Sequence, residues 1–429
     1  MPVDIASKAT GCYSPRVFTV AVYFFFCALL LQNTVALSVT VAGLGVPVHI
    51  IYLVKDLLLV FMVGLMLATK IVYKFSKVDR SALILMFFFL VVVIVKGGGI
   101  YDQAMQLRFY LTPLILYFLG RNLAPFSRPS VMIRFIFTIS SIYVFLGLMY
   151  VFVDRETLLH LGLGQLLSEK LGHIGREGAV FGGLPVNFNF YHKDGEMTNR
   201  AFGALFDPLA SAFMGAVLFF YLIEIRRLTS NKLAGVLAAG VAFIIVLTIT
   251  RAIIIGILIS FMVFQFQKKN LNRSAVFVLI VSLIFAVLML TVNFDSTFYA
   301  LDPSTRAHFS AYLNVNTATI FTGEPYGAGQ VRGAESLYLT LLKEHGLVLL
   351  LFYLVWLQIL YGFLRKHYNY PFVYATVAAM LVYMMASLTT EHWFSFSSGA
   401  LFWFLLGNNL TAIQTSAQNR KRMRFYVKC

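Results

Sequence analysis

The chain has 429 residues, of which 59% are hydrophobic and only 12% are charged. A soluble domain carries roughly 25% charged residues, so this composition excludes an ordinary soluble enzyme. The apolar residues come in blocks of about 20, the length of a helix that crosses a hydrocarbon core of about 30 Å. The formal net charge is +16, but the basic residues lie in short segments between these blocks. The sequence therefore predicts a membrane protein with no nucleic-acid partner.

The apolar blocks predict an all-α integral membrane protein with about 12 transmembrane helices in one domain, residues 1–429. In chain order we expect the helices at 17–37, 49–69, 81–96, 105–120, 131–153, 202–223, 232–249, 252–267, 274–294, 346–364, 371–389 and 394–413. The first block could also pass for a signal peptide. No small-residue cleavage site follows it, so we interpret it as a retained first helix.

The connections between the blocks alternate between rich and poor in lysine and arginine. With the N-terminus inside the cell, most of the 34 lysines and arginines fall in predicted cytoplasmic segments. This is the positive-inside pattern, and it predicts that both termini are cytoplasmic. The basic tail at 420–428 could also contact anionic membrane lipids.

Two long external loops interrupt the pattern, at residues 154–200 and 295–345. Long loops in compact proteins are usually functional or disordered. At the end of the second loop, the sequence AESLYLTLLKEH (334–345) places Leu337, Leu341 and Leu342 on one helical face. We expect a short interfacial helix that leads into the next span, although an early start of that span would give the same pattern.

Arginines are unusually frequent at the predicted outer edge of the membrane, namely Arg108, Arg200, Arg251, Arg306 and Arg332. Charged residues at membrane depth are costly and mark functional sites. A guanidinium binds phosphate oxygens in pairs, so this cluster predicts an anionic ligand such as a pyrophosphate. Arg200 and Arg251 each open a predicted helix, whose N-terminal N–H groups favour an anion. Each arginine alone could instead snorkel to lipid headgroups or pair with an acid such as Asp207.

Further candidate residues lie in or near the second loop. Glu335 follows a glycine-rich stretch and could act as a general base or orient a substrate hydroxyl; an ordinary helix-start carboxylate is the alternative. Tyr338 lies in the same segment and is a candidate for substrate binding. His392 lies in an external turn beside Trp393, where a membrane-interface role competes with a catalytic one. The three cysteines have no metal-binding or disulfide spacing, so no metal or cofactor is predicted.

Several segments together resemble one superfamily. They are LRFYLTPLILYFLGRNL (107–123), RAFGALFDPLASA (200–212), LTITRAIIIGIL (247–258), STRAHFSAY (304–312), GAGQ (327–330) and ESLYLTLLKEHGL (335–347). Their order, their spacing and the two long loops are similar to those of the O-antigen polymerases and O-antigen ligases. These are membrane glycosyltransferases of the GT-C type, and the resemblance covers most of residues 100–410.

The resemblance implies an enzyme of the bacterial inner membrane whose glycan donor is linked to undecaprenyl diphosphate. Arg200 and Arg251 fall where the superfamily holds the pyrophosphate, so we predict catalytic roles for Arg200, Arg251 and Glu335. We predict substrate-binding roles for Arg108, Arg306, Arg332, Asp207, Tyr338 and His392. The expected partners are undecaprenyl diphosphate-linked repeat units and membrane lipids, with a polysaccharide chain-length regulator as a further candidate.

Ligases carry a histidine in the segment that corresponds to 335–339, and the sequence ESLYL has none. We therefore predict a polymerase of oligosaccharide repeat units for O-antigen or a related surface polysaccharide. A ligase that transfers glycan to the lipid A core is an alternative. A transporter or flippase of a lipid-linked sugar or an anion is another, although transporters bind their substrates near the bilayer midplane at broken helices.

Overall fold

The computed structural model of the chain describes residues 15–44, 46–68, 75–122, 128–153, 155–164, 166, 180–181, 184–185, 189–191, 197–266, 320–323, 336–390 and 393–426. The helices are α1 (Pro15–Val41), α2 (Val48–Ala68), α3 (Lys77–Val95), α4 (Ile100–Asn122), α5 (Pro129–Phe152), α6 (Arg155–His160), α8 (Pro208–Thr229), α9 (Lys232–Leu247), α10 (Arg251–Phe266), α13 (Leu337–Thr340), the π-helical turn η5 (Leu341–His345), α14 (Gly346–Lys366), α15 (Val373–Ala386) and α16 (Phe396–Tyr426). The strands are β1 (Val180–Phe181), β2 (Leu184–Pro185), β3 (Asn189–Tyr191) and β4 (Met197–Asn199).

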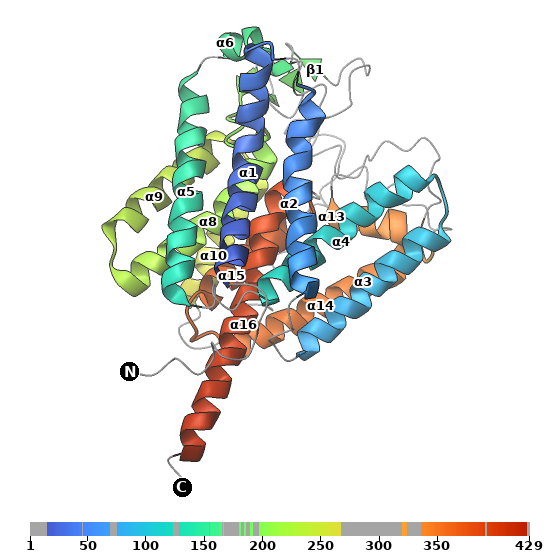
Figure 1. Cartoon of the computed structure of the whole chain (residues 1–429), viewed down its shortest axis with the longest axis vertical. Helices are drawn as coiled ribbons and strands as arrows, with labels where there is room; N and C mark the ends of the chain where they lie inside the picture. The colour runs from blue at the N-terminus through green and yellow to red at the C-terminus, as the bar shows by residue number, and fades with distance from the viewer. Residues whose placement is uncertain are drawn as a thin grey trace, which may run out of the picture.

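The described residues form a helical bundle with two small hairpins at one end (Figure 1). Helices α1, α2 and α5 stand nearly upright in this view, whereas α3, α4 and α14 are inclined to one side. The helix α6 and the strand β1 lie at the top, opposite the C-terminal end of α16. Antiparallel pairs join β1 to β2 and β3 to β4. Both hairpins fall within the loop predicted at 154–200.

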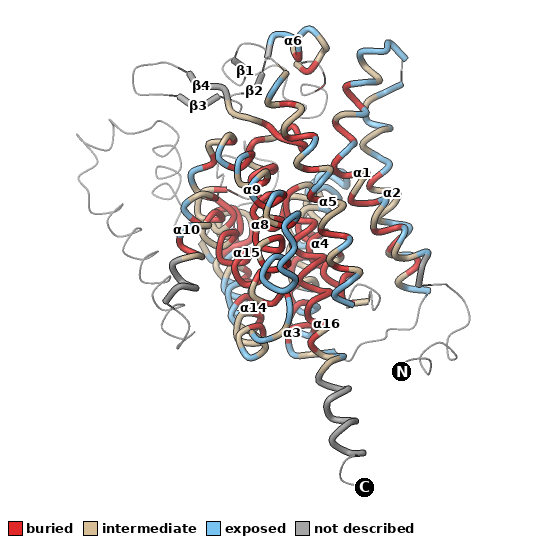
Figure 2. Tube along the Cα trace, turned by 90° about the vertical axis from the view of Figure 1, so that its left-hand side faces the viewer, coloured by how far each residue is buried: buried red, intermediate tan, exposed pale blue. Residues whose placement is uncertain are grey.

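Six helices of the described chain are long and apolar enough to cross a membrane, at residues 17–41, 48–68, 77–95, 129–152, 208–229 and 337–366. The helices α9, α10 and α15 are shorter but also apolar. Figure 2 shows buried residues gathered in the interior of the bundle and exposed ones on its outer helices, and many exposed side chains are large and apolar, among them Phe24, Leu57, Phe87 and Phe145. Because soluble monomers rarely expose large apolar patches, the surface fits a lipid environment. The chain is a multi-pass α-helical membrane protein.

Most predicted helices are present with ends within a few residues of those expected. The helix predicted at 274–294 lies outside the described residues, as does most of the loop predicted at 295–345. The last helix, predicted at 394–413, extends to Tyr426. The sixth helix, predicted at 202–223, begins only at Pro208.

The late start of α8 has a local cause. Asp207 is the N-cap of α8, and its carboxylate accepts two backbone N–H groups of the first turn at 2.9 and 3.2 Å. Pro208 occupies the first helical position, where its missing N–H has no cost. Phe206 has a φ of +50°, outside the helical region. The expectation that Arg200 opens a helix is therefore wrong. Arg200 precedes an apolar, buried turn, and the helix begins only after that turn.

The segment before α14 is helical but separated from it. Gly346 has a φ of +82°, and a Cβ there would collide with the carbonyl oxygen of Phe321. The N–H of Leu347 donates to the carbonyl of Ile320 at 2.7 Å. Residues 320–323 thus pack against a break between η5 and α14. The expected helix at 334–345 is present from Leu337, and buried side chains lie on more than one of its faces.

Helices α4 and α16 are in backbone contact. A Cβ at Gly120 of α4 would collide with the carbonyl oxygen of Phe404, and a Cβ at Gly407 of α16 would collide with that of Tyr117. Small residues permit such close approach of helices in membranes, where packing rather than water drives association. The pair of glycines therefore sets the distance between these two helices.

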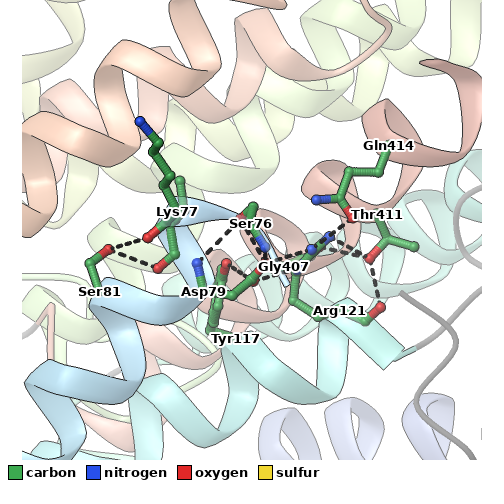
Figure 3. A network of polar contacts seen from close by, with 10 residues as sticks. Ser76, Lys77, Asp79, Ser81, Tyr117, Arg121, Gly407, Thr411 and Gln414 are labelled. Atoms are coloured by element: carbon green, nitrogen blue, oxygen red, sulfur yellow. Dashed lines mark hydrogen bonds and ion pairs between the residues drawn. The ribbon is translucent and has the colours of Figure 1, made fainter. Parts of the chain in front are cut away.

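A buried polar network joins α3, α4 and α16 (Figure 3). The guanidinium of Arg121 donates to both carboxylate oxygens of Asp79, at 2.7 and 2.8 Å, and both side chains are fully buried. Tyr117 donates to the same carboxylate at 2.6 Å. Arg121 also donates to Thr411 and Gln414 of α16. Arg121 lies in a predicted cytoplasmic segment, and Asp79 neutralises its charge inside the bundle.

Candidate functional site

The turn between α9 and α10 holds the side chain of Arg200. Its Nε donates to the carbonyl of Thr248 at 2.7 Å, and its Nη2 donates to the hydroxyl of Thr250 at 2.9 Å. The next N–H, that of Ala201, donates to the carbonyl of Leu247 at 3.0 Å. The segment that precedes α8 is therefore fastened to the start of α10, although the two are about 50 residues apart in sequence.

The backbone of this turn is strained. Ile249 lies between the two threonines and has a φ of +50°. Such a conformation is a genuine outlier for a β-branched residue and costs of order 1–3 kcal/mol. The strained turn directs the Thr248 carbonyl and the Thr250 hydroxyl toward the same guanidinium. Strain of this kind is often retained at ligand-binding sites.

Arg251 is the first residue of α10 and its side chain is exposed. The first N–H groups of a helix have no carbonyl partners within that helix, and the helix dipole adds partial positive charge there. The structure thus places the Arg200 guanidinium, the backbone of Arg251 and a helix N-terminus at one turn. This combination is suited to bind an anion with several oxygens, such as a phosphate or diphosphate.

The other predicted site residues that the structure describes have partners of their own. Asp207 caps α8. The hydroxyl of Tyr338 donates to the carbonyl of Met384 at 3.1 Å and so ties α13 to α15. Arg108 pairs with Asp56 on α2. Glu335, Arg306, Arg332 and His392 lie outside the described residues.

Arg108 belongs to a second charged cluster, formed by α2, α4 and the start of α16. Its Nη2 lies 3.1 Å from both carboxylate oxygens of Asp56. The ammonium of Lys55 lies 3.7 Å from the same carboxylate and donates to the carbonyl of Tyr52 at 2.8 Å. Both cations also lie over the ring of Phe396, at 5.4 and 5.8 Å from its centroid. We call Lys55, Asp56, Arg108 and Phe396 the α2–α4 cluster.

A third polar group lies beside the break at Gly346. The hydroxyl of Tyr110 donates to the carboxylate of Glu344 at 2.7 Å, and the buried His345 ring packs edge-on against Tyr110. Lys96, Thr322 and His345 are the polar members of a cavity of about 270 Å³ whose remaining lining is apolar. The cavity lies between α3, α14 and residues 320–323. A π-helical turn, as found at Glu344 and His345, is common at functional sites.

Sequence reasoning singled out Arg200 and Arg251 from their charge and position, and the structure brings them to one turn. Lys55 and Asp56 are visible in the sequence as ionisable residues within an apolar block, but the sequence gives no partner for them. Tyr110 carried no signal, because a tyrosine in an apolar block is usually a packing residue. The pairing of Glu344 with Tyr110 joins residues 234 apart, which sequence periodicity cannot reveal.

No family model, curated protein or solved structure matches the chain. The case for a function therefore rests on the residues of the chain and their arrangement.

Proposed function

We propose that the chain is a GT-C-type membrane glycosyltransferase, with about 12 spans, that polymerises repeat units of a surface polysaccharide at the outer face of the bacterial inner membrane. Both termini then lie in the cytoplasm. The donor is a growing glycan on undecaprenyl diphosphate, and the acceptor is a sugar of another lipid-linked repeat unit. The observation that carries the proposal is the joint position of Arg200 and Arg251 at the start of α10.

The chemistry needs few groups. A hydroxyl of the acceptor sugar attacks the anomeric carbon of the donor, the bond from that carbon to the diphosphate oxygen breaks, and undecaprenyl diphosphate leaves with the bonding electrons. Negative charge grows on the leaving diphosphate as this bond breaks. Arg200, fastened to the turn by two hydrogen bonds, and the adjacent Arg251 stabilise that charge.

A carboxylate accepts the proton of the attacking hydroxyl. Glu335 has this role in our proposal because it lies on the predicted outer face, one residue before the buried N-cap Ser336. Within the described residues Glu344 is a second candidate, since Tyr110 orients its carboxylate beside a cavity. The other buried or half-buried acids of the described residues are engaged differently: Asp79 pairs with Arg121, Glu224 with Arg227 and Asp56 with Lys55 and Arg108, while Asp207 caps α8.

Reconstitution tests the proposal. Purified protein in liposomes, supplied with the lipid-linked repeat unit of its host, is expected to release undecaprenyl diphosphate and to form a ladder of products. Arg200→Ala and Arg251→Ala should each lower the rate about 10²- to 10³-fold, the usual cost of one lost donor to a developing oxyanion. Arg134→Ala is the matched control, because Arg134 is an exposed arginine of α5 on the predicted cytoplasmic side.

Wild-type rates in both arginine variants would remove the α9–α10 turn from the reaction and with it the observation on which the proposal rests. A ligase would instead transfer glycan to a lipid A core supplied in the same liposomes. In cells, loss of a polymerase leaves a single repeat unit on the core, whereas loss of a ligase leaves the core bare.

A transporter or flippase is the second candidate, and two observations favour it. Lys55 and Asp56 lie inside the candidate span α2, and the helical segment 337–366 breaks at Gly346 beside a cavity. Broken helices and charges within the bilayer are features of transporter sites. The liposome assay separates the two functions, because a transporter moves the lipid-linked glycan across the bilayer without cleaving it.

A further inference from the structure

The α2–α4 cluster contains more positive than negative charge. Lys55 and Arg108 share the single carboxylate of Asp56, and both contact its Oδ2 oxygen, at 3.7 and 3.1 Å. Within the described chain no other acid pairs with either cation at salt-bridge distance. If all three groups are ionised, the cluster carries one positive charge that no acid among the described residues balances.

The cluster lies at a depth where such an imbalance is expensive. Lys55 is the eighth residue of α2, so it lies about 10 Å along the helix axis from its start at Val48. It is only 8% exposed. A cation inside a bilayer span costs several kcal/mol unless an anion accompanies it. The Phe396 ring, which both cations face, offsets part of this cost but supplies no charge.

Arg108 retains donors for an incoming anion. Its two hydrogen bonds to Asp56 both use Nη2, and within the described residues Nε and Nη1 make no hydrogen bond. The Arg108 side chain is 44% exposed. Asp56 and Phe396 therefore orient the guanidinium while leaving part of it accessible. Phosphate oxygens match such a group better than a single carboxylate does.

The α2–α4 cluster and the α9–α10 turn lie on different sides of the bundle. Helices α1 and α2 are in contact, as are α1 and α5, and α5 and α9. Figure 1 accordingly shows α5 and α1 between α9 on one side and α2 and α4 on the other. Two lipid-linked substrates can therefore approach the protein from opposite sides of the bundle.

We infer that the α2–α4 cluster binds the diphosphate of the second lipid-linked substrate, the acceptor, while Arg200 and Arg251 bind that of the donor. This inference rests on the proposed function and makes it more specific. A polymerase has two substrates that each carry a lipid diphosphate, whereas a ligase has one. The glycans then meet between the two sites, above the bundle.

Binding stoichiometry tests the inference. The full-length protein, in nanodiscs of a zwitterionic lipid with undecaprenyl diphosphate as the probe, is expected to retain two probe molecules in native mass spectrometry. The double variant Lys55→Met/Arg108→Gln should retain one, Arg251→Ala should retain one, and the triple variant none. In Lys55→Met/Arg108→Gln, the KM for the acceptor should also rise at least tenfold, while donor binding should stay unchanged.

Asp56→Asn separates ligand binding from a purely structural ion pair. Removing the competing carboxylate raises the positive charge of the cluster, so this variant should keep the second probe molecule and bind it more tightly. A cluster that only stabilises the fold would respond alike to Asp56→Asn and to Arg108→Gln, and equal loss of the second molecule in both would overturn the inference.

Two further arms identify the source of the anion. Inorganic diphosphate at the same concentration should not displace the second probe molecule, because it lacks the lipid tail. Displacement by phosphatidylglycerol would show a general site for anionic lipids and would overturn the assignment to the acceptor. Retention of two probe molecules by Lys55→Met/Arg108→Gln would refute this inference alone, whereas no binding to the wild type would refute the proposed function with it.

Discussion

The buried ion pair between Asp79 and Arg121 is expected to be important for stability. The pair Asp79–Arg121 is wholly inside the bundle, and its carboxylate also accepts a hydrogen bond from Tyr117. Burial penalises an isolated charge, and the opposite charge of the partner offsets that penalty for both side chains. Removing one partner leaves the other as an uncompensated charge in a low-dielectric interior.

We predict that Arg121→Met destabilises the protein by about 3–5 kcal/mol, because Asp79 is then buried without its cation. Thermal unfolding in detergent, followed by intrinsic fluorescence, measures the effect as a lowered Tm. Arg80→Met is the matched control: Arg80 is exposed and follows Asp79 in α3. Arg80→Met should leave the Tm nearly unchanged.

A double variant, Asp79→Asn/Arg121→Met, should recover part of the lost stability, because it removes both charges together. If the decrease in Tm of the double variant equals the sum of the decreases in Asp79→Asn and Arg121→Met, the two side chains act independently. That outcome would contradict the ion pair as the source of stability.

The sequence revealed the charges of the candidate sites but not their partners. The excess of arginine at the predicted outer edge was visible, and so was the Lys55–Asp56 pair inside an apolar block. The partners come from contacts over long distances in the chain, such as Arg108 with Asp56, which are 52 residues apart. Periodicity describes one helix at a time and contains no information on which helices meet.

At the scale of elements, the contact between α4 and α16 depends on two glycines. Gly120 and Gly407 each face a backbone carbonyl of the other helix. A methyl group at either position has no space unless the helices move apart. The interhelical distance is therefore set by backbone contact rather than by side-chain size.

We predict that Gly407→Ala destabilises the protein by about 1–3 kcal/mol, the usual cost of overpacking. The same thermal unfolding experiment measures it. Gly362→Ala in α14 is the control, because a Cβ there meets nothing within 4 Å. It should be neutral or slightly stabilising, since alanine favours a helix more than glycine does. Equal Tm values for both variants would show that α4 and α16 do not meet at Gly407.

Helix positions followed from apolar blocks because each span must be apolar over most of its length. Helix ends were predicted less well where apolar residues are buried but not helical. Residues 202–206 are apolar and buried, so they extend the apolar block of α8 toward Arg200, yet they form a turn. The Asp-Pro pair at 207–208 is a helix-start signal that is visible in the sequence. Our prediction gave more weight to the length of the apolar block and placed the start at residue 202.

At the scale of the whole molecule, the charge pattern predicts an orientation that accessibility can test. In a variant without the natural cysteines, Leu44→Cys between α1 and α2 should react with a membrane-impermeant maleimide added to intact cells. Thr229→Cys, at the end of α8, should react only after the cells are opened. Both positions are exposed, so they are matched in solvent access and differ in predicted side.

The opposite labelling pattern would invert the protein and place Arg200 and Arg251 in the cytoplasm, where lipid-linked repeat units are built rather than joined. Labelling of both positions in intact cells would mean that α1 to α8 do not cross the membrane in the predicted order.

The glycine contact between α4 and α16 also has a consequence for how the protein is made. Helix α4 is absent from the six apolar spans, since it carries Asp102, Gln103, Gln106 and Arg108. The face of α4 that carries Gly120 is covered by α16, which is synthesised long after α4. Until α16 has been synthesised, the unfinished chain contains the polar helix α4 without its packing partner. The insertion machinery then has to keep α4 away from lipid. A chain truncated before residue 396 would lack α16, so its α4 would stay bound to the insertion machinery.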